Sequence, residues 1–181
     1  MTPLRTLLGG LILAAATAVP AAAATSAAPA AGPAEWRTYD VLVSLRDLPR
    51  TYSCDELWYK FRDVLLQLGA RAYMTLTPYE CGYVGGGEAR SPSVEAKFAL
   101  PWPLRGAARR YAEVTAVTRS VRLQPGTPRS LQTGDCELVR QLRGTLLAAL
   151  PVNVTASDFS CQAPRASFAL TVSASLVASG G

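Results

Sequence analysis

One arrangement of elements occurs twice along this chain: a cysteine, an amphipathic helix, a short turn, a strand, a second cysteine and a further strand. The first copy covers residues 54–100 and the second covers residues 136–170. Each copy follows an extended segment with the alternating pattern of another strand. An internal repeat of this kind indicates two structural units that pack against each other. The sequence therefore predicts an α+β domain built from a tandem duplicated βαββ repeat.

The two copies agree in the phase of their helices and in their last strands. Leu57 and Leu138 occupy corresponding positions on the apolar faces of the two helices. The tripeptide Phe-Ala-Leu occurs at residues 98–100 and again at residues 168–170. Chance similarity between two helix–strand segments is the alternative, but it does not explain why helix phase, cysteine and tripeptide follow in the same order. We therefore interpret the pattern as a duplication.

The repeat also predicts a topology. Within each repeat we expect the first strand to pair with the third and the third with the second, because a right-handed crossover then lets the helix cover one face of the sheet. All neighbouring strands are antiparallel in that order. If the halves join edge to edge, two helices lie on one face of a six-stranded antiparallel sheet. Two small sheets packed face to face are the alternative.

The start of the chain is typical of an exported protein. Residues 1–24 combine a positive start at Arg5, an apolar stretch and small residues suited to cleavage, as in a secretory signal peptide. The apolar stretch is shorter than the ~20 residues of a membrane span, so we expect no transmembrane span after cleavage. The Ala/Pro-rich residues 25–34 lack periodicity and are predicted to form a flexible leader.

The remaining residues, 35–177, have the length of one domain. Pro101 and Pro103 flank Trp102, and because proline cannot donate to a β-ladder we place the boundary between the repeats there. The predicted repeats are residues 35–101 and 102–177. The formal net charge of +5 is modest, and the preference for arginine over lysine is more typical of a GC-rich bacterial genome than of a function.

The 4 cysteines fit an exported protein, in which disulfides form and persist. A helix of about 14 residues spans ~21 Å, and a returning strand of roughly eight residues brings the second cysteine of each copy back to the helix start. Pairing within each repeat, Cys54–Cys81 and Cys136–Cys161, is therefore favoured among the possible connectivities. The helix alignment nevertheless places Asp135, rather than Cys136, opposite Cys54. A zinc site lacks both CxxC spacing and histidine.

Period-two alternation of apolar residues predicts the strands. In the second repeat, Val152, Val154 and Ala156 are expected to face the core, and the preceding helix is expected to begin near Asp135. The other segments predicted to be extended are residues 39–46, 72–80, 94–100 and 111–123.

The chain contains no histidine, which excludes Ser-His-Asp and Cys-His triads, imidazole general catalysis and histidine-ligated metals. We expect no cofactor and no metal. Carboxylate catalysis stays open, since glycoside hydrolysis needs two carboxylates ~5–9.5 Å apart. Glu80 and Glu88 are the candidate pair for a small hydrolase that acts on an envelope glycan.

The first repeat contains an inserted segment, residues 82–91, that the second repeat lacks. Its glycines lack the GKT and GxGxxG patterns of phosphate-binding loops, and a mobile hairpin loop is the simpler interpretation. Long connections on a rigid sheet commonly carry function. We therefore name this end of the first repeat as the candidate binding site. Its candidate residues are Tyr79, Tyr83, Glu88 and Arg90.

These observations favour an exported, non-catalytic envelope or secreted protein, periplasmic or extracellular, that binds another macromolecule. An envelope glycan or an unidentified protein is the expected partner, and export argues against nucleic acid. A basic cluster at Arg105, Arg109 and Arg110 is compatible with acidic lipid, glycan or nucleic acid, but a solvated surface is the favoured interpretation. The alternatives are the carboxylate-dependent hydrolase and a purely structural domain.

Overall fold

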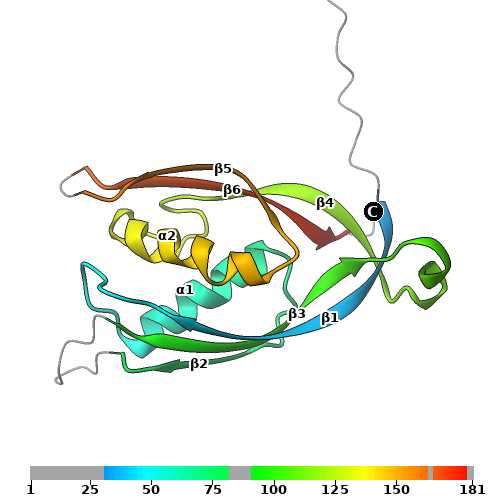
Figure 1. The fold of residues 1–181 in the computed structure, drawn as a ribbon, viewed down its shortest axis with the longest axis horizontal. Helices are drawn as coiled ribbons and strands as arrows, with labels where there is room; N and C mark the ends of the chain where they lie inside the picture. Colours follow the sequence, from blue (N-terminus) through cyan, green and yellow to red (C-terminus); the bar gives the residue numbers. More distant parts are fainter. Residues whose placement is uncertain (1–30, 82–90, 163–164, 179–181) are drawn as a thin grey trace, which may run out of the picture.

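The computed structural model describes residues 31–81, 91–162 and 165–178. Within them, six strands form one antiparallel sheet in the order β2-β3-β1-β4-β6-β5, with two α-helices packed against it (Figure 1). The fold is therefore α+β, as the sequence predicts. The elements are β1 (Ala31–Ser44), α1 (Cys54–Gln67), β2 (Thr75–Tyr79), β3 (Ser93–Pro103), β4 (Val114–Leu123), α2 (Cys136–Gly144), β5 (Asn153–Ser160) and β6 (Ser167–Val177).

The strand order within each half is the one that the sequence predicts. In the first half β1 pairs with β3 and β3 with β2, and in the second half β4 pairs with β6 and β6 with β5. The halves join edge to edge through β1 and β4, but only over Ala31–Ala34 and Val114–Val117. Beyond this short ladder the two halves diverge, and both helices lie between them (Figure 1). The sheet thus encloses its helices from two sides.

The core lies between the diverging halves and the helices. Ser53 caps α1, because its hydroxyl accepts a hydrogen bond from the backbone N–H of Glu56 at 3.1 Å. The helix then directs Leu57, Phe61 and Val64 inward, each with no exposed surface. The buried strand residues that meet the helices include Val43, Val94, Ala96, Phe98, Leu100, Val121, Leu123, Leu170 and Val172.

Two chain boundaries differ from the predictions. Residues 31–34 of the expected leader belong to β1, and Ala34 is fully buried, because the backbone there pairs with both β3 and β4. Residues 1–24 of the expected signal peptide and residues 25–30 of the leader lie outside the described residues. Residues 72–74 precede β2, which begins only at Thr75.

Pro101, at the expected boundary, does not end β3. The carbonyl of Ala99 accepts from the N–H of Arg71, so the backbone groups of residues 99, 101 and 103 point away from β1. Pro101 and Pro103 therefore remove no hydrogen bond from the ladder with β1, and the strand continues through Pro101 and ends at Pro103. Trp102 consequently lies within the sheet rather than at a break between the two halves.

The predicted inward position of Ala156 is wrong, because Ala156 pairs with Thr171 on the outer face and is exposed. Val154 lies opposite the buried Val172, on the inner face, but its side chain is still 37% exposed, and β5 is exposed along most of its length. The ladder between β5 and β6 shifts its register between Val154 and Ala156. In addition, α2 has 9 residues against 14 in α1, so it covers less of its half of the sheet.

Both predicted disulfides are confirmed. Cys54 is bonded to Cys81 and Cys136 to Cys161, so each helix start is linked to the chain that follows the next strand. Asp135, which takes the place opposite Cys54 in the helix alignment, is fully buried directly before α2.

Candidate functional site

Of the four predicted binding residues, the structure places Tyr79. It lies at the end of β2 and is 43% exposed, beside a shallow hollow of about 560 Å³ on the outer face of the first half. Its hydroxyl donates to Glu95 at 2.9 Å, and this hydrogen bond, followed by desolvation, raises the pKa of Tyr79. Tyr83, Glu88 and Arg90 lie outside the described residues, so the structure does not bring them together with Tyr79.

The same hollow contains the carboxylates of Asp40, Glu80 and Glu95. Lys97 lies 3.0 Å from Glu95, and its hydrogen bond, together with that of Tyr79, lowers the pKa of Glu95. A general acid for glycoside hydrolysis needs a carboxyl group with a raised pKa. The environment of Glu95 therefore disfavours that role. Glu88, the other member of the candidate hydrolase pair, lies outside the described residues.

A buried cluster of charges joins the two halves. Asp135 has no exposed surface, and its two oxygens accept four hydrogen bonds from Arg50 (2.8 Å), Tyr52 (3.0 Å), Lys60 (2.6 Å) and the backbone N–H of Gln132 (2.7 Å). A carboxylate offers about four lone-pair sites, so this one has none left for a ligand. The cluster is therefore a structural connection between α1 and the start of α2.

The buried cluster also shifts the pKa values of Asp135 and Tyr52. Burial by itself would raise the pKa of Asp135, but the hydrogen bonds from Lys60, Gln132 and Arg50 lower it below its ordinary value of 3.8. Burial and the nearby charge of Asp135 raise the pKa of Tyr52, which keeps its phenol protonated. Lys60 also donates to the carbonyl of Ser130 at 2.6 Å, so it too is satisfied.

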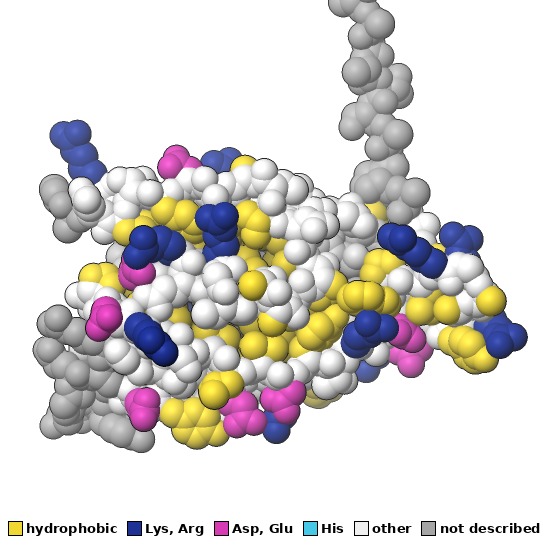
Figure 2. Space-filling view, in the orientation of Figure 1, with side chains coloured by type: hydrophobic (Ala, Val, Ile, Leu, Met, Phe, Trp, Pro, Cys, Tyr) yellow, Lys and Arg dark blue, Asp and Glu magenta, His cyan; other side chains and the backbone are white. Residues whose placement is uncertain are grey.

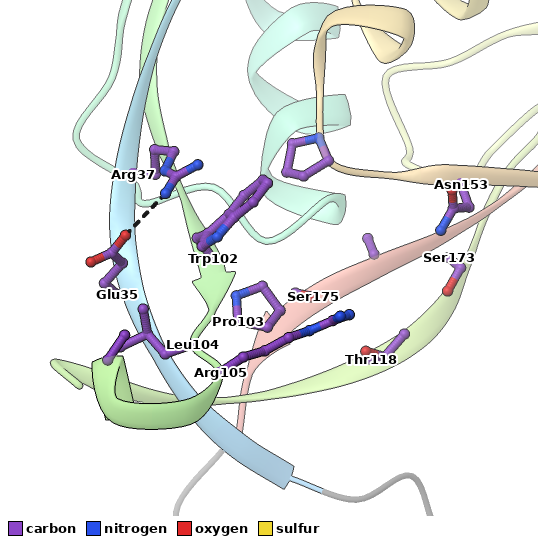
Figure 3. A pocket seen from close by; sticks show the side chains of 13 residues that line it. Glu35, Arg37, Trp102, Pro103, Leu104, Arg105, Thr118, Asn153, Ser173 and Ser175 are labelled. Atoms are coloured by element: carbon purple, nitrogen blue, oxygen red, sulfur yellow. Dashed lines mark hydrogen bonds and ion pairs between the residues drawn. The ribbon is translucent and has the colours of Figure 1, made fainter. Parts of the chain in front are cut away.

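A cleft of about 780 Å³ lies at the point where the halves diverge (Figure 3). One wall comes from β1 and β3 and the segment after β3, and the other comes from β4, β6 and the start of β5. The volume lies in the range of ligand sites, ~300–1,000 Å³. Its lining residues with polar side chains are Glu35, Arg37, Arg105, Thr118, Asn153, Ser173 and Ser175.

The wall from β1 and β3 presents a fixed guanidinium. Arg37 lies over the Trp102 ring, with its central carbon 3.9 Å from the ring centroid, and one of its N–H groups donates to Glu35 at 3.2 Å (Figure 3). A stacked and hydrogen-bonded guanidinium is held in one orientation, and four of its five N–H donors stay free of this ion pair. Arg37 is therefore a preorganised donor at the mouth of the cleft.

A second guanidinium enters the cleft from Arg105, which Figure 3 shows extending toward the wall that carries Thr118. Directly after it, a 3₁₀ turn, η1 (Gly106–Tyr111), projects from the body of the molecule (Figure 1). Arg109, Arg110 and the 62%-exposed Tyr111 lie on this turn. Figure 2 shows basic side chains at this end of the molecule as well as elsewhere on the same face. The positive surface of the cleft thus continues outward.

The sequence named the basic residues at 105, 109 and 110 but did not place them at a site. The prolines that flank Trp102 predicted a boundary between the repeats, so Trp102 was not among the predicted site residues. Glu35 and Arg37 gave no signal, because they precede the first predicted strand, residues 39–46. Asn153, Ser173 and Ser175 belong to the other half and meet them only through the fold.

Glu35 is the one carboxylate among the lining residues of the cleft, and it forms an ion pair with Arg37. Among the described residues, no cluster of three or more histidine, cysteine, aspartate or glutamate side chains is arranged to hold a metal.

The helices in the described part of the chain include none long and apolar enough to cross a membrane.

Comparisons with known proteins add no role for these residues. No protein-family model matches the chain. No curated protein matches it, and no solved structure does either. The chemistry of the cleft is therefore argued from its own side chains.

Proposed function

We propose that the protein is an exported, non-catalytic binding module, and that its macromolecular ligand enters the cleft between the two halves of the sheet. The observation that carries this proposal is the Arg37–Trp102 stack beside the extended Arg105 in an open cavity of about 780 Å³. Exposed, preorganised donors of this kind are typical of recognition surfaces. The two-carboxylate arrangement of a glycosidase has no counterpart in the lining of the cleft.

Export is the second part of the proposal. Residues 1–24 have the pattern of a secretory signal peptide, and two disulfides join described residues. The protein then acts in the periplasm or outside the cell. An intact mass of the exported protein that begins near Thr25 supports this assignment, and a mass that still includes Met1 excludes it.

We also propose that the two halves arose by tandem duplication of a βαββ unit. Equal strand order and equivalent disulfides support this origin. The single-helix, three-strand unit occurs once on each side of the short β1–β4 ladder. A sequence profile built from the first halves of related chains should detect their second halves. A profile that detects first halves alone speaks against duplication.

A capture experiment tests the binding role. The mature chain is immobilised and exposed to envelope extract as wild type, Trp102→Ala and Arg105→Ala, with Tyr73→Ala as the control. Tyr73 is 93% exposed and does not line the cleft, so its removal should change nothing. We expect a specific partner to be retained by the wild type and the control and lost by both cleft variants. A partner set that is the same for all four chains rejects the cleft.

The outer hollow at Tyr79 is the second candidate site, favoured by the exposure of Tyr79 and of Leu42, which is 64% exposed. Deletion of residues 82–91 in the same capture experiment tests it. Loss of the partner in this deletion, with retention in Trp102→Ala and Arg105→Ala, would move the site to the outer face. Turnover of a glycan that is abolished by Glu80→Gln would instead favour the hydrolase.

A further inference from the structure

We propose that the ligand of the cleft is an acidic glycan, a sugar chain that carries carboxylate, sulfate or phosphate groups as well as free hydroxyls. This inference rests on the binding role proposed above, because it names the class of ligand for the same cleft. It follows from two kinds of polar group that meet there, guanidinium groups that only donate hydrogen bonds and small side chains that both donate and accept.

The guanidinium groups define the anionic part of the ligand. Arg37 and Arg105 contribute two positive charges to the lining and Glu35 one negative charge, so the cleft is positive in balance. Glu35 engages Arg37 through a single N–H at 3.2 Å. Within the described part of the chain, Arg105 forms no ion pair. A planar guanidinium with free N–H pairs binds carboxylate, sulfate or phosphate oxygens in bidentate fashion.

The opposite wall defines the rest of the ligand. It carries Thr118, Asn153, Ser173 and Ser175 (Figure 3). Hydroxyl and amide groups both donate and accept, which matches sugar hydroxyls that do the same. A sugar chain offers several hydroxyl groups per residue to these side chains, whereas an acidic peptide offers one backbone N–H and one C=O per residue, so the sugar matches this wall more fully.

The state of Trp102 argues against a nucleic acid. Non-specific binding of single strands relies on bases that stack on open aromatic faces. Here the guanidinium of Arg37 already covers one face of the Trp102 ring at 3.9 Å.

The basic side chains of Arg109 and Arg110 on the projecting turn extend the positive surface along one direction, as a chain with repeated acidic groups requires.

The test is a calorimetric titration of the mature, disulfide-bonded chain with three acidic probes and two comparison probes. The acidic probes are oligogalacturonate, a sulfated heparin oligosaccharide and a phosphorylated mannan oligosaccharide. A neutral malto-oligosaccharide of the same length and a poly-glutamate peptide are the comparisons. We expect saturable binding to at least one acidic sugar, at least tenfold weaker binding to the neutral sugar and to poly-glutamate, and a loss of affinity as salt concentration rises.

Variants locate the binding. Loss of one charge-assisted hydrogen-bond donor should weaken binding of the acidic sugar by about tenfold or more in Arg105→Ala and in Arg37→Ala. Arg143→Ala is the matched control, since Arg143 is exposed on α2 and does not line the cleft. Arg37→Lys keeps the charge but loses the planar fork, and it should also bind more weakly. Circular dichroism and unreduced peptide maps confirm that each variant is folded.

Several outcomes overturn the inference. Equal affinity for the acidic and neutral sugars, tighter binding of poly-glutamate, or equal effects of Arg143→Ala and Arg105→Ala each contradict it. Failure of every acidic sugar to bind also rejects it. If the same cleft variants nevertheless lose a partner from envelope extract, the binding role survives and the glycan class alone is wrong. If neither experiment depends on the cleft, both proposals fail.

Discussion

Asp135 shows how a single residue holds the two halves together. It belongs to the second half, yet Arg50, Tyr52 and Lys60 of the first half all donate to its carboxylate. Arg50 and Lys60 also contact Glu56 on α1, which balances the charge of the cluster. A buried carboxylate of this kind is stabilising only while all its partners are present, because loss of one leaves the others buried and uncompensated.

Replacement of Asp135 by Asn should therefore lower the free energy of unfolding by about 3–5 kcal/mol, because Lys60 and Arg50 lose the anion that compensates them. The measurement is urea unfolding at neutral pH. The control is Asp158→Asn, since Asp158 is exposed on β5 and should change stability by about 0.5 kcal/mol or less. Equal stability of the two variants would refute the structural role of Asp135.

The pKa of Asp135 also predicts a pH dependence. The pKa in the folded protein is lowered from 3.8, so the unfolded chain takes up a proton first as the pH falls. The stabilisation by Asp135 is fully present above its unfolded pKa and is lost as the pH falls through the lower folded pKa. Wild type should lose stability in this acid range more steeply than Asp135→Asn. If the free energy of unfolding falls with pH equally steeply in wild type and in Asp135→Asn, the lowered pKa of Asp135 is contradicted.

This cluster was not predicted from the sequence, although one signal for it was present. Lys60 falls on the apolar face of α1, between Leu57 and Phe61, which signals a buried partner. That partner, Asp135, lies 75 positions away along the chain, and no local pattern identifies it. Periodicity reveals which face of an element is buried, but it does not reveal which distant residue meets that face.

At the scale of elements, the two helices differ in how they meet the sheet. The 14-residue α1 ends at a tight turn in which Gly69 has a φ of 91°, and this turn lies against β6 of the other half. A side chain at Gly69 would approach Ser175 O and Leu176 Cδ2 to within 2.8 Å. The shorter α2 leaves β5 largely exposed. The repeat in the sequence predicted both helices but not this difference in cover.

Gly69→Ala should accordingly lower the free energy of unfolding by about 2 kcal/mol or more, because an added Cβ disfavours positive φ and collides with β6. Gly144→Ala is the matched control: Gly144 ends α2, and nothing lies within 4 Å of a Cβ placed there. This control should be neutral or slightly stabilising, since alanine favours helix. Thermal unfolding of both variants separates the two effects, and similar melting temperatures would show that the contact with β6 is unimportant.

At the scale of the whole molecule, the central feature is that one sheet is shared by two halves that meet over a short ladder and then separate. The ladder between β1 and β4 covers Ala31–Ala34, whereas the ladder between β1 and β3 runs from Ala34 to Ser44. The strand order on each side followed from the repeat and the rule of right-handed crossovers. The cleft did not follow from the repeat, because its walls come from both halves of the chain. In addition, residues 31–37 were expected to be leader or to precede the first strand.

The most direct test of the central claim uses Trp102 as a reporter of the cleft. The chain has 3 tryptophans, so Trp36→Phe combined with Trp58→Phe leaves Trp102 as the single emitting residue. A ligand that engages Arg37 should alter the stack at 3.9 Å and hence the emission of Trp102. Titration with oligogalacturonate and the other acidic sugars should produce a saturable emission change that the neutral sugar does not produce. Saturable binding by calorimetry without any change in Trp102 emission, or no saturable response to any of these sugars, would contradict the account.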